Sequence, residues 1–333
     1  MKKLLALLTL ISAPIFVEAH TRWFADGELP PIETTEPTAL YLTVWGLIVL
    51  AITFIGIFFE RKSWFKFSFL NPKKPHVFER AASTFVMVVG AFFIIAGTHE
   101  YLFSPNQTIE AGIPIVLIYL QILIGLAFLL GIASRVCGII LAFMWASTFH
   151  FVGWVAALEN IWVLSTAIFI TLMGNEYFSI ISFSFLRKIV APYKKYGLSI
   201  LRLGTGTTLI VLGLSEKILA PQFGIDFLSR YEWNFMEMIG IKFSDYLFIL
   251  SSGSVEILFG LIFVLGVVTR LNSLVVAIVF SIPLFILGPI ELAGHLPHFT
   301  AVVLLLLFGN GGHFRLIKPL FKKKTVKKLA KAK

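Results

Sequence analysis

The sequence predicts an all-α integral membrane protein. Hydrophobic residues make up 58% of its 333 residues, charged residues only 14%, and the mean hydropathy is +0.90. A soluble protein of this length needs a more highly charged surface. The apolar residues also fall in runs of about 20, the length of helix that crosses the hydrocarbon core of a bilayer. Together with the gathering of basic residues in a few short segments, these observations assign the chain to the multi-pass membrane proteins.

Residues 1–19 have the features of a cleaved secretory signal. Two lysines are followed by an apolar stretch, and small residues stand at Val17 and Ala19, the positions that a signal peptidase recognises. Cleavage after Ala19 would make His20 the first residue of the mature chain, with an external segment over 20–39. An uncleaved anchor is the alternative.

Nine apolar segments that follow are each interpreted as a membrane span. They are 40–59, 82–102, 113–133, 136–153, 158–181, 198–219, 246–268, 271–290 and 296–310.

The charge distribution predicts the orientation of these spans. Lys and Arg concentrate in a loop at 60–80, a linker at 184–197 and a tail at 312–333, whereas the loops 104–113 and 288–296 contain none. Cytoplasmic segments are the basic ones in such proteins. We therefore expect a bacterial inner-membrane protein with its mature N-terminus outside and its C-terminus in the cytoplasm. The lipid bilayer, not nucleic acid, then explains the net charge of +10.

One four-span unit occurs twice along the chain. The stretch Gln121–Gly131 matches Glu256–Gly266 at an offset of 135 residues, and the same offset relates Asn175 to Asn310. The repeat places a first unit at 81–183 and a second at 198–311, after an N-terminal transmembrane helix at 40–59.

The opening spans of the two units align at a smaller offset. Gly90 matches Gly206 and Glu100 matches Glu216, 116 residues later, so the second unit carries about 19 extra residues, which we place within 222–245. Four spans is an even number, so both units point the same way and are expected to pack as parallel halves.

This pattern resembles the DoxX-like membrane proteins, whose second helix reads E-x-x-x-G-x-x-x-x-x-G-x-x-(T/S)-R. The stretch from Glu256 to Arg270 fits that pattern, while the first unit has Gln121 in place of the acid. The resemblance covers about residues 80–310. It implies two tandem parallel four-helix bundles plus one N-terminal span, nine spans in all after signal cleavage. Family members are associated with sulfur oxidation, quinone-linked redox chemistry and small-molecule or metal stress, so the resemblance implies a fold more than an activity.

Several histidines and acids are expected at the outer ends of the spans and suggest a metal site. Neutral imidazoles bind copper and other transition metals, and carboxylates can complete the shell. An N-terminal histidine would chelate through its amine and its ring, and two histidines three residues apart share one face of a helix. The alternative is that these groups pair with each other, with backbone carbonyls or with interfacial water. The predicted metal ligands are His20, His99, Glu100, His150, His295 and His298.

A quinone-linked function is the second hypothesis. A carboxyl group near the bilayer surface could accept the proton of a quinol. The structural alternative is that such acids hydrogen-bond across the bundle, with Lys217 as a local ion partner. Because Cys137 is the single cysteine, a disulfide within the chain and an iron–sulfur cluster are excluded. The acids expected to be buried or interfacial are Glu100, Glu159, Glu216, Glu256 and Glu291.

The leading functional hypothesis is an accessory membrane component that handles metal ions of the copper type, or redox equivalents, at the outer face. Redox or metal-handling partner proteins would complete it, with copper, another transition metal or a quinone as cofactor. The alternatives are a quinone-linked oxidoreductase subunit, a small-solute transporter, and a structural or assembly protein. The interiors of the predicted spans are almost wholly apolar with charges at their ends, which is unusual for a transporter.

Overall fold

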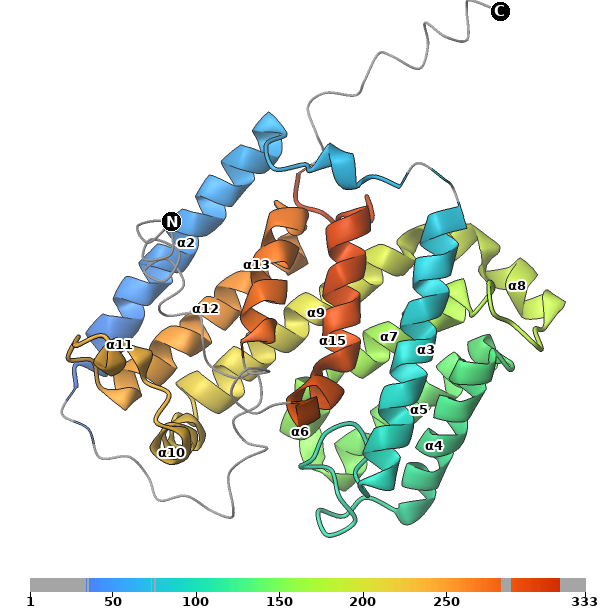
Figure 1. The fold of residues 1–333 in the computed structure, drawn as a ribbon, viewed down its shortest axis with the longest axis horizontal. Coiled ribbons are helices and arrows are strands. Elements are labelled where there is room, and N and C mark those ends of the chain that lie inside the picture. The colour runs from blue at the N-terminus through green and yellow to red at the C-terminus, as the bar shows by residue number, and fades with distance from the viewer. Residues whose placement is uncertain (1–33, 35, 73, 75, 283–288, 318–333) are drawn as a thin grey trace, which may run out of the picture.

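The structure is a computed structural model, and Figure 1 shows its fold. It describes residues 34–317 except 35, 73, 75 and 283–288. The expected signal peptide, His20 and most of the external segment and basic tail lie outside these residues. Helices make up the described part of the chain, which contains isolated β-bridges but no named strand.

A helix stands at each of the nine predicted spans. The N-terminal helix α2 (Thr38–Lys62) leads through η2 (Ser68–Leu70) into the first repeat segment, whose helices are α3 (His76–Thr98), α4 (Ile115–Leu130), α5 (Ser134–Phe151), α6 (Gly153–Glu159) and α7 (Ile161–Met173). A linker of α8 (Ser184–Val190) and η3 (Ala191–Tyr196) follows. The second segment consists of α9 (Gly197–Leu212), the π-helix η4 (Gly213–Ile218), α10 (Gln222–Tyr231), α11 (Phe235–Met238), α12 (Asp245–Leu265), α13 (Thr269–Ser281) and α15 (Pro289–Phe308).

Five of the described helices are long and apolar enough to cross a membrane. Four of them are Thr38–Lys62, His76–Thr98, Ser134–Phe151 and Asp245–Leu265. The fifth is the continuous helical stretch Ser184–Ile218, which runs from α8 through η3 and α9 to η4. A sixth would be formed by α6 and α7 together, which meet at a bend of 54°. The helices α4, α13 and the main part of α15 are apolar but shorter. The fold is therefore that of a helical protein with several membrane-crossing candidates.

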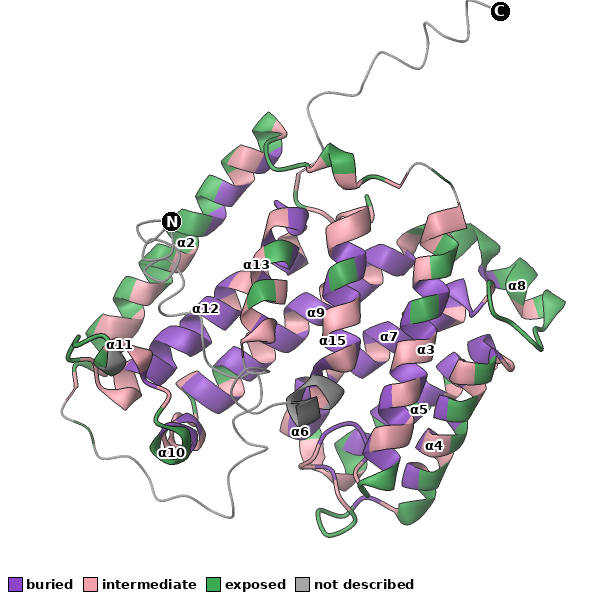
Figure 2. Cartoon of the chain, in the orientation of Figure 1, coloured by how far each residue is buried: buried purple, intermediate pink, exposed green. Residues whose placement is uncertain are grey.

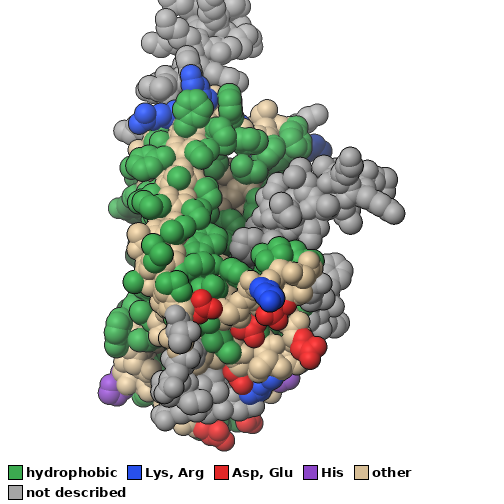
Figure 3. Space-filling model, turned by 90° about the vertical axis from the view of Figure 1, so that its left-hand side faces the viewer, with side chains coloured by type: hydrophobic (Ala, Val, Ile, Leu, Met, Phe, Trp, Pro, Cys, Tyr) green, Lys and Arg blue, Asp and Glu red, His purple; other side chains and the backbone are tan. Residues whose placement is uncertain are grey.

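The burial pattern agrees with a lipid-facing surface. In Figure 2, α2 and the outward side of α4 are largely exposed, whereas α9 and α12 are buried between their neighbours. Exposed apolar side chains of α2, among them Leu47, Leu50 and Phe54, contribute to the broad hydrophobic face seen in Figure 3. Acidic side chains gather toward one end of that face, near α10 and α11. An apolar belt between charged ends is what a bilayer requires.

Glycines bring the first two helices of each segment into close contact. A Cβ atom built on Gly90 of α3 would lie 2.6 Å from the carbonyl oxygen of Gly125 in α4. A Cβ atom on Gly206 of α9 would lie 2.7 Å from the carbonyl oxygen of Gly260 in α12. These are the pairs that the sequence offsets relate, so both segments use the same backbone approach, which small residues permit in membrane helices.

The two segments are interleaved rather than packed as two self-contained bundles. The last helix of the first segment, α7, packs extensively on α9, the first helix of the second segment. In the reciprocal contact, α15 packs more extensively on α3 than on α9 of its own segment (Figure 1). This exchange of neighbours places the interface between the segments at the centre of the molecule.

Candidate functional site

A π-helix interrupts the first helix of the second segment. Helix α9 continues beyond Leu212 into η4, which contains Glu216 and Lys217, and both of these side chains are buried. In the first segment the matching helix α3 ends at Thr98, and Glu100 is exposed with a φ of 63°. The two glutamates that align in sequence thus have different environments. Single π-turns of this kind are frequent at functional sites.

Lys217 forms an ion pair with Glu256 in the protein interior. Its Nζ lies 2.7 Å from Oε1 of Glu256, and the residues are 0% and 8% exposed. Glu256 lies near the middle of α12, far from either helix end. The expectation that charges stay at the ends of the spans is therefore wrong for Glu256, whereas Lys217 lies in the last turn of η4. The ammonium group from this neighbouring helix makes burial of the carboxylate tolerable.

Two buried histidines of α15 lie beside this ion pair. His295 is within electrostatic reach of Glu256, and its ring centroid is 6.3 Å from that of His298. The His298 ring contacts Trp162 of α7 with a centroid distance of 5.0 Å. Since α7 belongs to the first segment and α15 to the second, this contact crosses the interface between them.

A second acid reaches the π-helix from the first segment. Glu159, the last residue of α6, is buried and accepts a hydrogen bond of 2.8 Å from the hydroxyl of Ser215. Ser215 directly precedes Glu216 and Lys217 on η4, so this hydrogen bond connects Glu159 to the ionisable groups described above. We call this set the polar cluster, and it consists of Glu159, Ser215, Glu216, Lys217, Glu256, His295 and His298.

The first segment carries a neutral counterpart of the polar cluster. By the repeat offsets, Tyr101 stands where Lys217 does, Gln121 where Glu256 does and Asn160 where His295 does. The buried Gln121 amide donates to the backbone carbonyls of Phe93 and Tyr101 at 3.3 and 3.2 Å. A neutral side chain therefore occupies this position in one copy of the fold, with its amide nitrogen bonded and its Oε1 without a partner, so the fold does not require the charges that the second copy contains.

Asn160 is satisfied in the same neutral manner. Its amide donates to the carbonyl of Ala156 and to the hydroxyl of Ser104, both at 3.0 Å, and its oxygen accepts from the Trp162 indole. Trp162 thus lies between the two sites, bonded to the neutral one and in ring contact with His298 of the charged one.

The structure gathers only part of the expected metal-ligand set. His295 and His298 lie in the polar cluster, whereas His99 and Glu100 at the end of α3 and His150 near the end of α5 are exposed. The expected ligand His20 lies outside the described residues, and the side chain of Glu291 is likewise not described. Among the residues that the structure does describe, no group of three or more His, Cys, Asp or Glu side chains could hold a metal ion.

Arg202 of α9 is fully buried and was not among the residues predicted from the sequence. Its guanidinium donates to the carbonyls of Phe263 and Val264 at the end of α12, and to those of Asn310, His313 and Phe314 after α15. It therefore satisfies carbonyls that lack partners at helix ends. A lone arginine within an apolar predicted span was a signal that could have identified this residue.

Known proteins supply no further guide. No protein-family model, no curated protein and no solved structure matches the chain. The resemblance to DoxX-like proteins consequently rests on the motif residues of the sequence.

Proposed function

We propose that the chain is a multi-pass membrane protein of DoxX-like organisation, with nine spans, that binds and releases protons at the polar cluster and couples this to the passage of a small solute. The observation that carries the proposal is the buried ion pair between Lys217 of the π-helix η4 and Glu256 of α12. Ionisable side chains inside a membrane bundle are costly and commonly mark proton or ion pathways.

The neutral counterpart strengthens this assignment. Gln121 and Asn160 show that uncharged side chains can fill the matching positions with hydrogen bonds to the backbone. A packing role alone does not account for charges in the second copy. Protonation chemistry does, because Glu256 and the histidines can each exchange a proton whereas an amide cannot.

The positions of the cluster residues suggest how proton binding would be coupled to movement. A proton on the Glu256 carboxylate would remove the partner of Lys217 and weaken the link between η4 and α12. The Ser215–Glu159 hydrogen bond and the His298–Trp162 contact cross from one segment to the other. A change in cluster charge would thus act on the contacts between the two repeats, and repeat motion is a common basis of alternating access.

A redox function at the same cluster is the second candidate. Oxidation of a quinol releases two protons and two electrons. Glu256 beside His295 has the chemistry of a proton acceptor, and a redox partner protein would take the electrons. Handling of a copper-type ion by His295 and His298, with partner proteins supplying further ligands, is the version of this candidate that involves a metal. Metal analysis of the purified protein and of His295→Ala/His298→Ala tests it directly.

The test of the main proposal is a pH-jump experiment on proteoliposomes adsorbed to a solid-supported membrane. Protonation of a site inside the membrane field displaces charge, so the wild type is expected to give a transient current that protein-free liposomes lack. Glu256→Gln should abolish most of this current. Glu176→Gln, which alters a carboxylate beyond the end of α7, should retain it.

A double variant separates loss of the site from loss of the fold. Lys217→Met/Glu256→Gln removes both charges, and replacing a buried ion pair with neutral groups is often harmless to stability. This variant should remain folded and show no transient current. A wild-type current no larger than that of empty liposomes, or an undiminished current in the double variant, would overturn the proposal.

A further inference from the structure

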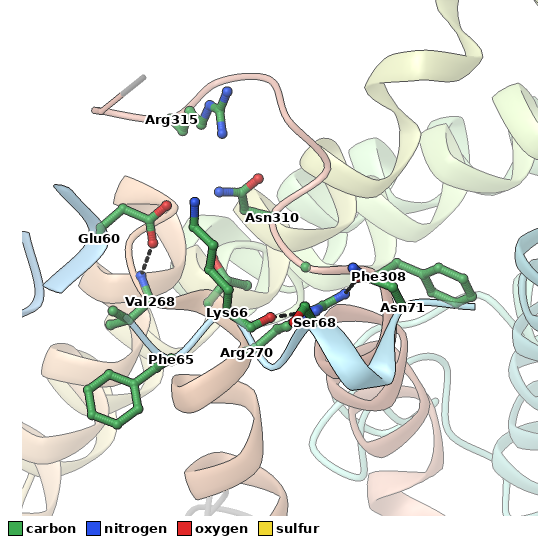
Figure 4. A pocket seen from close by; sticks show the side chains of 12 residues that line it. Glu60, Phe65, Lys66, Ser68, Asn71, Val268, Arg270, Phe308, Asn310 and Arg315 are labelled. Carbon is green, nitrogen blue, oxygen red and sulfur yellow. Dashed lines mark hydrogen bonds between the residues drawn. The ribbon is translucent and has the colours of Figure 1, made fainter. Parts of the chain in front are cut away.

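A separate hollow opens where α2 ends, α13 begins and the segment after α15 passes between them. Its volume is about 330 Å³, and its lining includes Lys66, Thr269, Arg270, Asn310 and Arg315 (Figure 4). None of these residues belongs to the polar cluster. The hollow lies at the end of the helices that carries Lys62 of α2 and the N-terminus of α13.

The repeat provides an internal control for this hollow. Ser134, Arg135 and Asn175 of the first segment correspond to Thr269, Arg270 and Asn310, and they line a space of only about 10 Å³. There the carboxylate of Glu176 lies 2.6 Å from the Arg135 guanidinium, and it also pairs with Arg187 and Lys194. The same offset places Gly311 at the position of Glu176. The second segment thus has the matching arginine without the acid.

Cationic groups nevertheless gather at the second position. The Lys66 side chain extends into the hollow from the loop after α2, and Arg315 lies across from it (Figure 4). Within the part of the chain that the structure describes, neither Lys66 nor Arg315 pairs with a carboxylate. Glu60, the acid in the lining, accepts a hydrogen bond of 2.9 Å from the backbone amide of Val268.

Two polar atoms in the lining are buried without a hydrogen-bond partner. They are Nε of Arg315 and Oγ1 of Thr269, and Thr269 is only 4% exposed. By contrast, the Arg270 guanidinium is occupied with the carbonyls of Lys66 and Phe67 and with the Asn71 side chain, so it fixes the wall of the hollow. Buried polar groups normally have partners. Ser134 Oγ and Arg135 Nε of the first segment are likewise without one, so the atom that distinguishes the second site is Arg315 Nε. An incoming ligand with several oxygen atoms would supply its partner.

We propose that this hollow binds a phosphate group, with Lys66 and Arg315 as its cationic contacts and with Thr269 and Asn310 as neutral ones. The bound phosphate would supply the anion that the second segment lacks. It would not lie on the arginine as Glu176 does, because the Arg270 guanidinium already has other partners. Arg and Lys bind phosphate oxygens through charge-assisted hydrogen bonds. The group can belong to the headgroup of a lipid or to free phosphate, since the binding chemistry is shared.

Native mass spectrometry of the delipidated full-length protein tests the proposal with dioleoylphosphatidylglycerol as the probe and dioleoylglycerol as the phosphate-free control. One phosphatidylglycerol is expected to bind in preference to dioleoylglycerol. Lys66→Gln/Arg315→Gln should weaken this binding by about tenfold or more, as loss of two cationic contacts predicts. Lys62→Gln/Lys188→Gln removes the same charge from exposed positions and should leave binding unchanged.

Two further measurements distinguish the source of the phosphate and guard against misfolding. The first is calorimetric titration of inorganic phosphate without lipid. If free phosphate is the ligand, the wild type should bind it and Lys66→Gln/Arg315→Gln should bind it more weakly. Thr269→Val keeps every charge and should weaken binding of whichever probe is bound. Equal weakening in the two charge variants, or probe binding that none of the hollow variants alters, would overturn the proposal.

Discussion

At the scale of single residues, the buried charge of Lys217 determines how substitutions in the polar cluster should change the stability of the protein. Glu256→Gln leaves its ammonium buried and unpaired, so we expect a loss of stability of about 3–5 kcal/mol. Lys217→Met/Glu256→Gln should recover most of it. Thermal unfolding in detergent, followed by tryptophan fluorescence, measures both. A double variant as unstable as the single one would contradict the interpretation.

The neutral position of Gln121 in the first segment permits the opposite experiment, in which a buried charge is introduced instead of removed. Gln121→Glu places a carboxylate at the position that matches Glu256, but Tyr101 stands where Lys217 would be. The buried charge has no cation of that kind beside it, so Gln121→Glu should lower the unfolding temperature at neutral pH. Acidification should reduce the deficit, because protonation removes the charge. The wild type measured over the same pH range is the control.

Glu176 gives a pH dependence of stability with a defined sign. Burial acts to raise the pKa of this carboxyl, but the hydrogen bonds and charges of Lys194 and Arg135 outweigh burial and hold the pKa below its ordinary value. A carboxylate whose pKa is lowered by folding stabilises the protein above the pKa of the unfolded chain and loses that effect as the pH falls toward the folded pKa. The unfolding temperature of the wild type should therefore exceed that of Glu176→Gln at pH 7, and the difference should shrink by pH 3. A difference independent of pH would show that the ion pairs contribute nothing.

The sequence identified several members of the polar cluster but not their convergence. Glu256, Glu159 and Glu216 were expected to be buried or interfacial, and all three are buried. The sequence also predicted equivalent places for Glu100 and Glu216. Their environments differ, because α3 ends at Thr98 whereas η4 continues α9 and carries Glu216 within it. A π-turn depends on the packing around it and leaves no periodic pattern in the sequence.

At the scale of helices, the repeated glycine contacts make a prediction that compares both copies. Gly90→Ala and Gly206→Ala each place a Cβ atom within 3 Å of a backbone carbonyl oxygen of the adjacent helix. The helices must separate, at an expected cost of about 1–3 kcal/mol. Gly46→Ala on α2, where no atom lies within 4 Å of the added Cβ, should be tolerated. Unfolding temperatures equal to that of the wild type in the Gly90 and Gly206 variants would contradict the close approach.

Helix positions were the feature most accessible from sequence. Apolar length and turn glycines define them locally, so each predicted span overlaps a helix. Only five of the described helices, or six if α6 and α7 act together, are long and apolar enough to cross a membrane. The span predicted at 158–181 shows the limit of that approach. Its helix α7 ends at Met173, and the chain reverses through Gly174 so that Glu176 meets Arg135. Local hydropathy does not predict this ion pair, because Arg135 lies on another helix, α5.

At the scale of the whole molecule, the arrangement of the repeats was only partly predictable. The sequence offsets predict duplication and a parallel orientation of the two units, but which helices become neighbours depends on how their surfaces fit together. The observed contacts of α7 with α9 and of α15 with α3 join the two segments more closely than side-by-side bundles would. The polar cluster lies at this interface, so movement between the segments necessarily alters its surroundings.

This interleaving predicts that neither half folds alone. Residues 1–196 and 197–333, expressed as separate chains with different tags, should associate when they are made together, because α7 and α9 restore their contact from opposite fragments. Each fragment made alone exposes helix surfaces that the other normally covers, and should aggregate or be degraded. Co-purification through one tag, followed by size-exclusion chromatography, measures the outcome. Two fragments that are each monodisperse alone would show that the units are independent bundles and that the polar cluster does not depend on their contact.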